Sequence, residues 1–120
     1  MPMPDGSFKV QVVRGVPVVT APEEIDSTNA PCLWSALLEA AAQGPGPVVV
    51  DMTRTEFCDS SGIRALLRSQ KQALNDGREV LLATSGPAVV RVFQLTGTDH
   101  IIRRFASLDE ALGQTHAAVG

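Results

Sequence analysis

The stretch Val48–Leu67, VVVDMTRTEFCDSSGIRALL, decides the fold, because it joins a buried strand to a helix through a polar turn. Its first three residues form an apolar run, which is typical of a strand covered on both faces. Apolar residues then recur at the spacing of one helix face, as Ile63, Leu66, Leu67 and Leu74, and Gly77 indicates the end of that helix. The turn Asp59-Ser60-Ser61-Gly62 therefore places two serines at a helix N-terminus.

Length and composition predict one compact domain. The chain has 120 residues, of which 44% are hydrophobic, 4% aromatic and 19% charged, so we expect an aliphatic core. Residues 7–118 are predicted to form the domain and residues 1–6 a flexible N-terminal tail. The net charge is −3 and the basic residues are scattered, which argues against a nucleic-acid partner. Neither a secretory leader nor an apolar run of membrane-spanning length is present, so we expect a cytoplasmic protein.

The remaining chain alternates strand and helix patterns around this central stretch. We expect a hairpin from Phe8–Val12 and Val18–Thr20, with a turn at Arg14–Pro17. Later elements are a helix that begins after a cap at one of residues 26–29, a strand at 80–83, a helix from Pro87 to Thr96, a strand from His100 to Phe105, and a last helix opened by the capping box Ser107–Glu110. The order ββαβαβαβα predicts an α/β fold with a mixed sheet covered by helices.

Three side chains are predicted to be buried. Trp34 lies on the apolar stripe of the first helix, so we interpret it as a core anchor. Cys32 and Cys58 lack the spacing of a metal site, which favours buried free thiols. None of the three is expected to carry chemistry.

Two enzyme classes fit the central stretch poorly. A serine between a strand and a helix is found in the hydrolase nucleophile elbow, but this turn lacks the first glycine of that motif. The histidine bases on offer are His100 and His116, in a turn and near the C-terminus. Asp51 ends a strand, as a receiver-domain phosphoacceptor does, but the acidic partners and the lysine of that site are missing. We therefore interpret Asp51 as a strand-end hydrogen-bonding group.

The serines fit two other roles. A hydroxyl in the first turn of a helix is accessible to a protein kinase, and a phosphate there could accept hydrogen bonds from free helix N–H groups. Phosphorylation adds about 1.5 to 2 negative charges, which is enough to switch binding. Asp and Ser are also preferred N-caps, so the same residues are compatible with a purely structural start to the helix. Chemistry alone leaves both roles open.

Four segments in order resemble the STAS domain family, and within it the stand-alone anti-sigma factor antagonists of bacteria. They are Glu24-Ile25-Asp26, similar to the family's G-E-L-D segment; VVVDMTRTEFCDSSGI; SGPAVVRVFQLTG; and SLDEAL. The resemblance implies a STAS-like domain without catalytic activity or a cofactor of its own. It also implies that the unmodified protein binds an anti-sigma factor, a serine kinase of the histidine-kinase-like fold, and thereby releases the sigma factor.

In this family the kinase phosphorylates the serine that follows the aspartate, which corresponds to Ser60, and a PP2C-type phosphatase restores it. ATP and Mg²⁺ come with the kinase. The resemblance also implies a partner-facing surface, with Ser61 as a neighbour that could cap the helix. The residues assigned to that surface are Asp26, Asp59, Ser61, Gly62, Ile63 and Arg64.

This sequence departs from the family pattern at two of these places. Glu23 stands where the family often has glycine, and Arg64 stands where a small residue is common. Arg64 lies four residues after Ser60, within reach of a phosphate on the same helix face. We expect a monomer or weak homodimer. An alternative is a STAS scaffold protein of a larger signalling complex, without a rapid phosphorylation switch.

Overall fold

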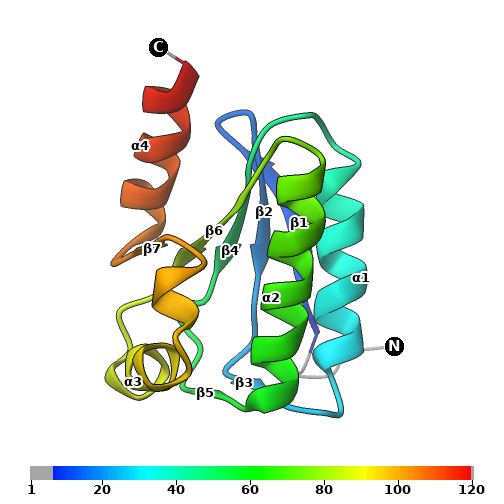
Figure 1. The fold of residues 1–120 in the computed structure, drawn as a ribbon. Helices are drawn as coiled ribbons and strands as arrows, with labels where there is room; N and C mark the ends of the chain where they lie inside the picture. Colours follow the sequence, from blue (N-terminus) through cyan, green and yellow to red (C-terminus); the bar gives the residue numbers. More distant parts are fainter. Residues whose placement is uncertain (1–6, 120) are drawn as a thin grey trace.

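The computed structural model describes residues 7–119 of the protein, and the side chains of residues 7–115. Figure 1 shows a central sheet with helices on both faces. The elements in chain order are β1 (Lys9–Val13), β2 (Val16–Thr20), β3 (Glu24–Ile25), α1 (Ala30–Ala41), β4 (Val48–Asp51), β5 (Phe57–Cys58), α2 (Ser60–Asn75), β6 (Val80–Ala83), α3 (Pro87–Thr96), the short 3₁₀ helix η1 (Thr98–His100), β7 (Arg104–Phe105) and α4 (Leu108–Val119).

The predicted mixed α/β fold is confirmed. Within the described residues the main sheet has the order β1-β2-β4-β6-β7, and β3 and β5 form a separate parallel pair. The hairpin β1–β2 is antiparallel, and the other neighbours in the main sheet are parallel. Helices α1 and α2 lie side by side on one face, while α4 covers the other (Figure 1). The long elements keep the predicted order, and β3 and β5 are additions to it.

Alternate residues of β4 pack into two separate hydrophobic cores, one on each face of the sheet. Val48 and Val50 point toward α1 and α2, whereas Val49 packs on the opposite side with Leu112 of α4. All three valines are buried, with exposed fractions of 4% or less. The strand is therefore covered on both faces, as its uninterrupted apolar sequence predicts.

The hairpin turn is tighter than predicted. Arg14 and Gly15 both have positive φ, 52° and 80°, which is the backbone of the two-residue turns that match strand twist. The turn therefore ends at Gly15. Pro17, placed in the turn by the sequence, lies in β2 opposite Val12.

The predicted strand from His100 to Phe105 is wrong over most of its length. The carbonyl of Thr98 accepts hydrogen bonds from the N–H groups of Ile101 and Ile102, so the chain turns instead of extending. This turn inserts Ile102 into the core beneath α3. Only Arg104 and Phe105 remain to pair with β6.

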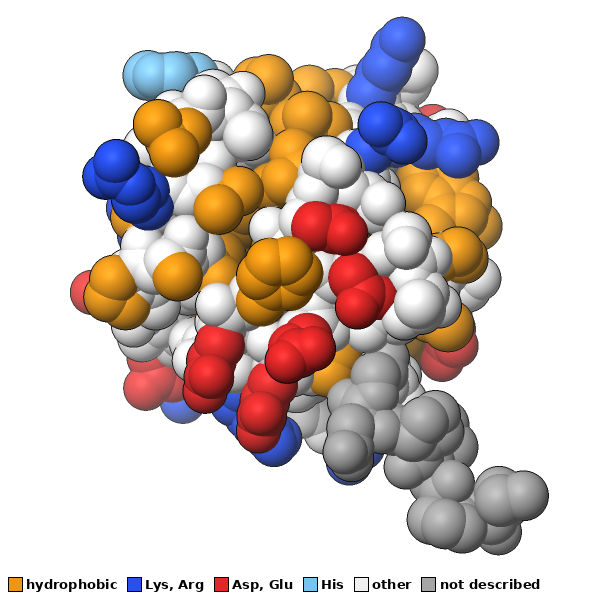
Figure 2. All heavy atoms as spheres, turned by 90° about the horizontal axis from the view of Figure 1, so that it is seen from below, with side chains coloured by type: hydrophobic (Ala, Val, Ile, Leu, Met, Phe, Trp, Pro, Cys, Tyr) orange, Lys and Arg blue, Asp and Glu red, His pale blue; other side chains and the backbone are white. Residues whose placement is uncertain are grey.

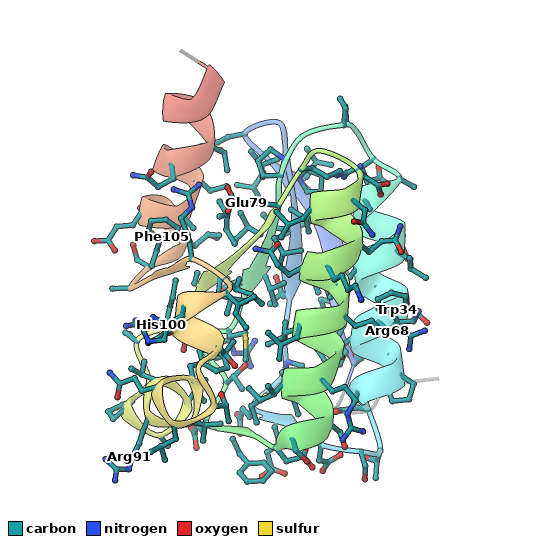
Figure 3. All side chains as sticks on the ribbon, in the orientation of Figure 1. Trp34, Arg68, Glu79, Arg91, His100 and Phe105 are labelled. Atoms are coloured by element: carbon teal, nitrogen blue, oxygen red, sulfur yellow. The ribbon has the colours of Figure 1, made fainter. Side chains whose placement is uncertain are left out.

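Three residues that the sequence predicts to be buried are exposed or only partly buried. Cys32 is exposed, whereas Cys58 is buried as expected; both are free thiols. Leu74, assigned to the buried face of α2, is 57% exposed near the helix end. Trp34 is only partly buried, and the guanidinium of Arg68 lies 4.5 Å from its ring centroid, a cation–π contact that joins α1 to α2 (Figure 3).

Candidate functional site

The two short strands β3 and β5 support the candidate site. Glu24 pairs with Phe57 and Ile25 with Cys58 in parallel register. The next residue along each strand is an aspartate, so Asp26 and Asp59 follow neighbouring strand ends. The N–H of Asp59 also donates to the carbonyl of Ile25 over 3.0 Å. This pairing, which the sequence analysis missed, brings the segment before α1 against the beginning of α2.

Asp59 is the N-cap of α2. Its backbone is extended, with φ −91° and ψ −173°, and its Oδ1 accepts hydrogen bonds from the N–H groups of Ser61 at 2.8 Å and Gly62 at 3.2 Å. A carboxylate also suits the positive end of the helix dipole. The cap is therefore the aspartate, and the expectation that Ser61 caps the helix is wrong.

The two serines consequently lie inside the first helical turn, and they differ in environment. Ser60 is the first helical residue and is exposed, whereas Ser61 is partly buried. Within the described residues, the hydroxyl of Ser60 makes no hydrogen bond, so it is available to an incoming reagent.

Gly62 fixes how closely α2 approaches the two short strands. A Cβ atom at this position would lie 2.6 Å from Sγ of Cys58 and 2.7 Å from Cγ2 of Ile25, both far inside contact distance. Glycine therefore allows the first turn of α2 to pack directly on β3 and β5. That close packing positions the exposed Ser60 two residues earlier in the same turn.

Asp26 is held by the loop that precedes α1. Its Oδ1 accepts hydrogen bonds from the hydroxyl and the N–H of Thr28. Together with the N–H of Asn29, these bonds lower the pKa of Asp26, because they favour the charged carboxylate. Asn29 stands at the N-cap position of α1, but its side chain bonds to Asp26 N–H and Glu24 carbonyl instead of to the helix.

The other two residues assigned to the partner surface point in different directions. Arg64 is exposed on α2, one turn beyond Ser60. Ile63 is only 6% exposed and belongs to the core between the sheet, α1 and α2. Of the predicted set, the structure brings Asp26, Asp59 and Ser60 together at one end of the molecule, and Ile63 lies beneath them.

The catalytic candidates whose side chains the structure describes, His100 and Asp51, make no hydrogen bond with the serines. His100 lies on η1 beside α3, and it makes no hydrogen bond with either serine within the described residues (Figure 3). The side chain of His116 lies outside the described residues. Asp51 accepts hydrogen bonds from the N–H and hydroxyl of Thr53 at 3.0 and 2.6 Å, which confirms its strand-end role.

The described part of the chain holds no group of three or more His, Cys, Asp or Glu side chains that could hold a metal ion. Between residues 7 and 119, no helix is both long enough and apolar enough to cross a membrane.

This fold and this site define a known class of domain. The chain belongs to the STAS domain family, whose model matches residues 7–111. Among its relatives, the anti-sigma-F factor antagonist RsfB of Mycobacterium tuberculosis is 31% identical over 99 residues, which cover 82% of this chain and 80% of RsfB.

Solved structures agree with this assignment. An anti-sigma factor antagonist from Mycobacterium paratuberculosis superposes with a TM-score of 0.83 at 30% identity, covering 97% of this chain and 99% of that one. An anti-sigma factor antagonist (STAS) domain protein from Planctomyces limnophilus gives a TM-score of 0.78 at 28% identity, covering 92% and 98%. The resemblance inferred from the four sequence segments is therefore confirmed.

Proposed function

We propose that this protein is an anti-sigma factor antagonist controlled by phosphorylation of Ser60. The unmodified form binds an anti-sigma factor and so releases the sigma factor, and phosphorylation ends this binding. One observation carries the proposal: Ser60 lies on the first turn of α2, directly after the capping Asp59, and its exposed hydroxyl makes no hydrogen bond to any described residue. The names of its relatives, which are anti-sigma factor antagonists, support the same function.

The choice of Ser60 over Ser61 now has a physical basis. A kinase must bring the serine oxygen into line with a nucleotide phosphate, so the hydroxyl must be accessible. Ser60 is exposed, whereas Ser61 is partly buried and its N–H is held by the carboxylate of Asp59. Ser60 therefore meets the steric requirement with less rearrangement.

A phosphate on Ser60 would remain a strong perturbation of this surface. Asp59 already occupies the N–H groups of Ser61 and Gly62, so the phosphate cannot take them over without displacing the cap. It would add about 1.5 to 2 negative charges beside Asp59, and like charges at short range repel. The modification thus changes the surface that a partner meets while the fold, held by its two cores, persists.

Arg64 is the cation best placed to respond to that phosphate. Side chains four residues apart lie on the same helix face, and an arginine can bind phosphate oxygens through charge-assisted hydrogen bonds. In the described structure Arg64 takes part in no ion pair. We assign it a role in partner choice. Equal affinity of the wild type and Arg64→Gly for every candidate kinase would contradict that role.

In this proposal the partner supplies the chemistry. The anti-sigma factor is the serine kinase and brings ATP and Mg²⁺, and a PP2C-type phosphatase reverses the modification. The antagonist acts by binding in the cytoplasm and performs no catalysis itself.

The experiment is incubation of the full chain with candidate anti-sigma factor kinases and Mg-ATP, followed by intact mass and site mapping. We expect one phosphate on Ser60, no incorporation in Ser60→Ala, and normal incorporation in the matched variant Ser61→Ala. Label on Ser61, or undiminished label in Ser60→Ala, would refute the site assignment. Size-exclusion chromatography with light scattering separates an antagonist, expected as a monomer or weak dimer, from a scaffold that forms a large assembly.

A further inference from the structure

An aromatic side chain is exposed next to the proposed phosphorylation site. Phe57 lies in β5, two residues before Asp59, and 51% of its surface is accessible. Its neighbour Cys58 points inward and is 2% exposed. Side chains alternate between the two faces of a strand, so the inward packing of Cys58 forces Phe57 outward. Burying a phenylalanine is favourable, so a partner that covers this exposed ring would gain binding free energy.

Carboxylates surround this phenylalanine. Glu24 is its pairing partner across the β3–β5 pair, Glu56 precedes it, and its N–H donates to the carbonyl of Glu23. Asp26 and Asp59 follow the ends of the same two strands. Figure 2 looks onto this end of the molecule and shows acidic side chains gathered around an exposed apolar one. We call this surface the acidic rim, made of Glu23, Glu24, Asp26, Glu56 and Asp59.

No lysine or arginine neutralises the acidic rim within the described structure. None of its five carboxylates forms an ion pair with a lysine or arginine there; the ion pairs that do form engage Asp109, Glu79 and Asp99. Five like charges on one small surface repel one another, and the Debye length of about 8 Å at physiological salt leaves neighbouring charges poorly screened. A partner that brings cations to this surface would relieve the repulsion.

Leu74 provides a comparison, because it is an exposed apolar side chain without this setting. It is 57% exposed, but it lies at the far end of α2. Phe57 combines an aromatic ring, a surrounding ring of polar groups and proximity to Ser60. Binding hot spots have this organisation, with a central aromatic anchor and a polar rim that excludes water.

We propose that Phe57 is the anchor by which this protein binds its anti-sigma factor, and that it enters an apolar pocket bordered by lysine or arginine side chains. The inference rests on the proposed function and specifies the chemistry of the partner surface. Charge complementarity and continuity with the surface around Ser60 select this occupant. The same arrangement accounts for the switch, because a phosphate on Ser60, three residues after Phe57, would lie at the edge of the partner's pocket once Phe57 has entered it.

The test compares Phe57→Ala with the control Leu74→Ala, which removes a similarly exposed apolar side chain at the end of α2 far from Ser60. Affinity for the cognate anti-sigma factor is measured by calorimetry on the unphosphorylated full chain. We expect at least a tenfold loss for Phe57→Ala and less than a twofold change for Leu74→Ala. A change below threefold for Phe57→Ala would overturn the proposal.

A second pair of variants tests the acidic rim without touching the anchor. Glu24→Gln and Glu56→Gln together should slow association and flatten its dependence on NaCl concentration. An association rate with unchanged salt dependence would contradict the charge argument. Glu39→Gln on α1 together with Glu110→Gln on α4 removes the same number of charges away from the acidic rim and is the charge-matched control.

The phosphorylation assay separates this inference from the proposed function. Phosphorylation of Ser60 in the wild type, together with unchanged affinity of Phe57→Ala, would reject the anchor and leave the switch in place. A wild-type chain that binds the anti-sigma factor through Phe57 but is never phosphorylated would reject the switch and leave the anchor.

Discussion

Replacing Gly62 by alanine probes the packing that positions Ser60. The added Cβ would lie 2.6 Å from Cys58 Sγ and 2.7 Å from Ile25 Cγ2, whereas an ordinary contact begins at 3.4 Å. The first turn of α2 must therefore shift by 0.8 Å to restore ordinary contact with the sulfur. Neither neighbour can swing aside, because Ile25 is fully buried and Cys58 nearly so.

Two opposing terms set the stability of Gly62→Ala. Overpacking a buried site costs about 1 to 3 kcal/mol. Alanine in place of glycine stabilises a helix by up to about 1 kcal/mol. The steric term is the larger, so we expect the free energy of unfolding to fall by about 1 to 2 kcal/mol.

Urea denaturation measures this change, and Gly113→Ala provides the control. Gly113 lies in α4, and no described atom outside its own helix backbone and chain neighbours lies within 4 Å of the position a Cβ would take, so only the helix term applies and we expect a gain of up to about 1 kcal/mol. Combining Gly62→Ala with Cys58→Ala removes one of the two clashes and should recover part of the loss. A Gly62→Ala protein as stable as the wild type would refute the close-packing argument.

Three further predictions concern the cap and the cysteines. Asp59→Ala should lower the free energy of unfolding by about 1 kcal/mol, because Ser61 and Gly62 lose their acceptor, whereas Asp59→Asn keeps a capping oxygen; equal urea midpoints for the two would count against the cap. Iodoacetamide at pH 8 should modify exposed Cys32 and spare buried Cys58, as read by intact mass and peptide mapping; equal rates would contradict the burial of Cys58. Burial, reinforced by the charge of Asp59, raises the pKa of Cys58 to about 12 from an ordinary 9.0. The protonated Cys58 thiol therefore contributes its full stabilisation below pH 9, and this contribution declines as the pH rises toward 12. The free energy of unfolding should fall less for Cys58→Ala than for the wild type over that interval. Parallel profiles of the two proteins would show that the thiol does not contribute.

The central strand, turn and helix follow from local sequence. The apolar run of β4 and the helical spacing of Ile63 and Leu66 are signals within a few residues, and each is confirmed by burial on the expected side. The end of α2 at Asn75 lies two residues before the predicted stop at Gly77. Such elements are predictable because the apolar pattern lies within one short segment, and the same residues become buried when that segment folds.

The pairing of β3 with β5 is not predictable in this way. Each strand has two residues, too few for any period, and their pairing depends on segments more than thirty residues apart. Trp34 illustrates a related limit: helical spacing assigned it to the core, but it lies at the boundary where Arg68 covers its ring. Helical periodicity predicts the face of the helix on which a side chain lies. It does not predict whether a neighbouring helix extends far enough to bury that side chain.

Some features of the candidate site are likewise predictable from local sequence, and others depend on the fold. The sequence placed two serines at a helix start, and the STAS resemblance selected Ser60. The identity of the α2 cap depends on backbone geometry, because Asp59 is extended and Ser60 is helical. The sequence Asp59-Ser60-Ser61-Gly62 alone does not predict that geometry. The proposed role of Phe57 depends on the fold, because the acidic rim around it includes residues of both β3 and β5.

The most direct test of the account measures the affinity of the cognate anti-sigma factor for two forms of this protein, unmodified and fully phosphorylated on Ser60. Calorimetry at fixed salt gives both dissociation constants, and release of the sigma factor from its complex is followed in parallel. The account predicts tight binding and sigma release by the unmodified form, and affinity weakened at least tenfold by the phosphate. Equal affinity of the two forms would contradict it.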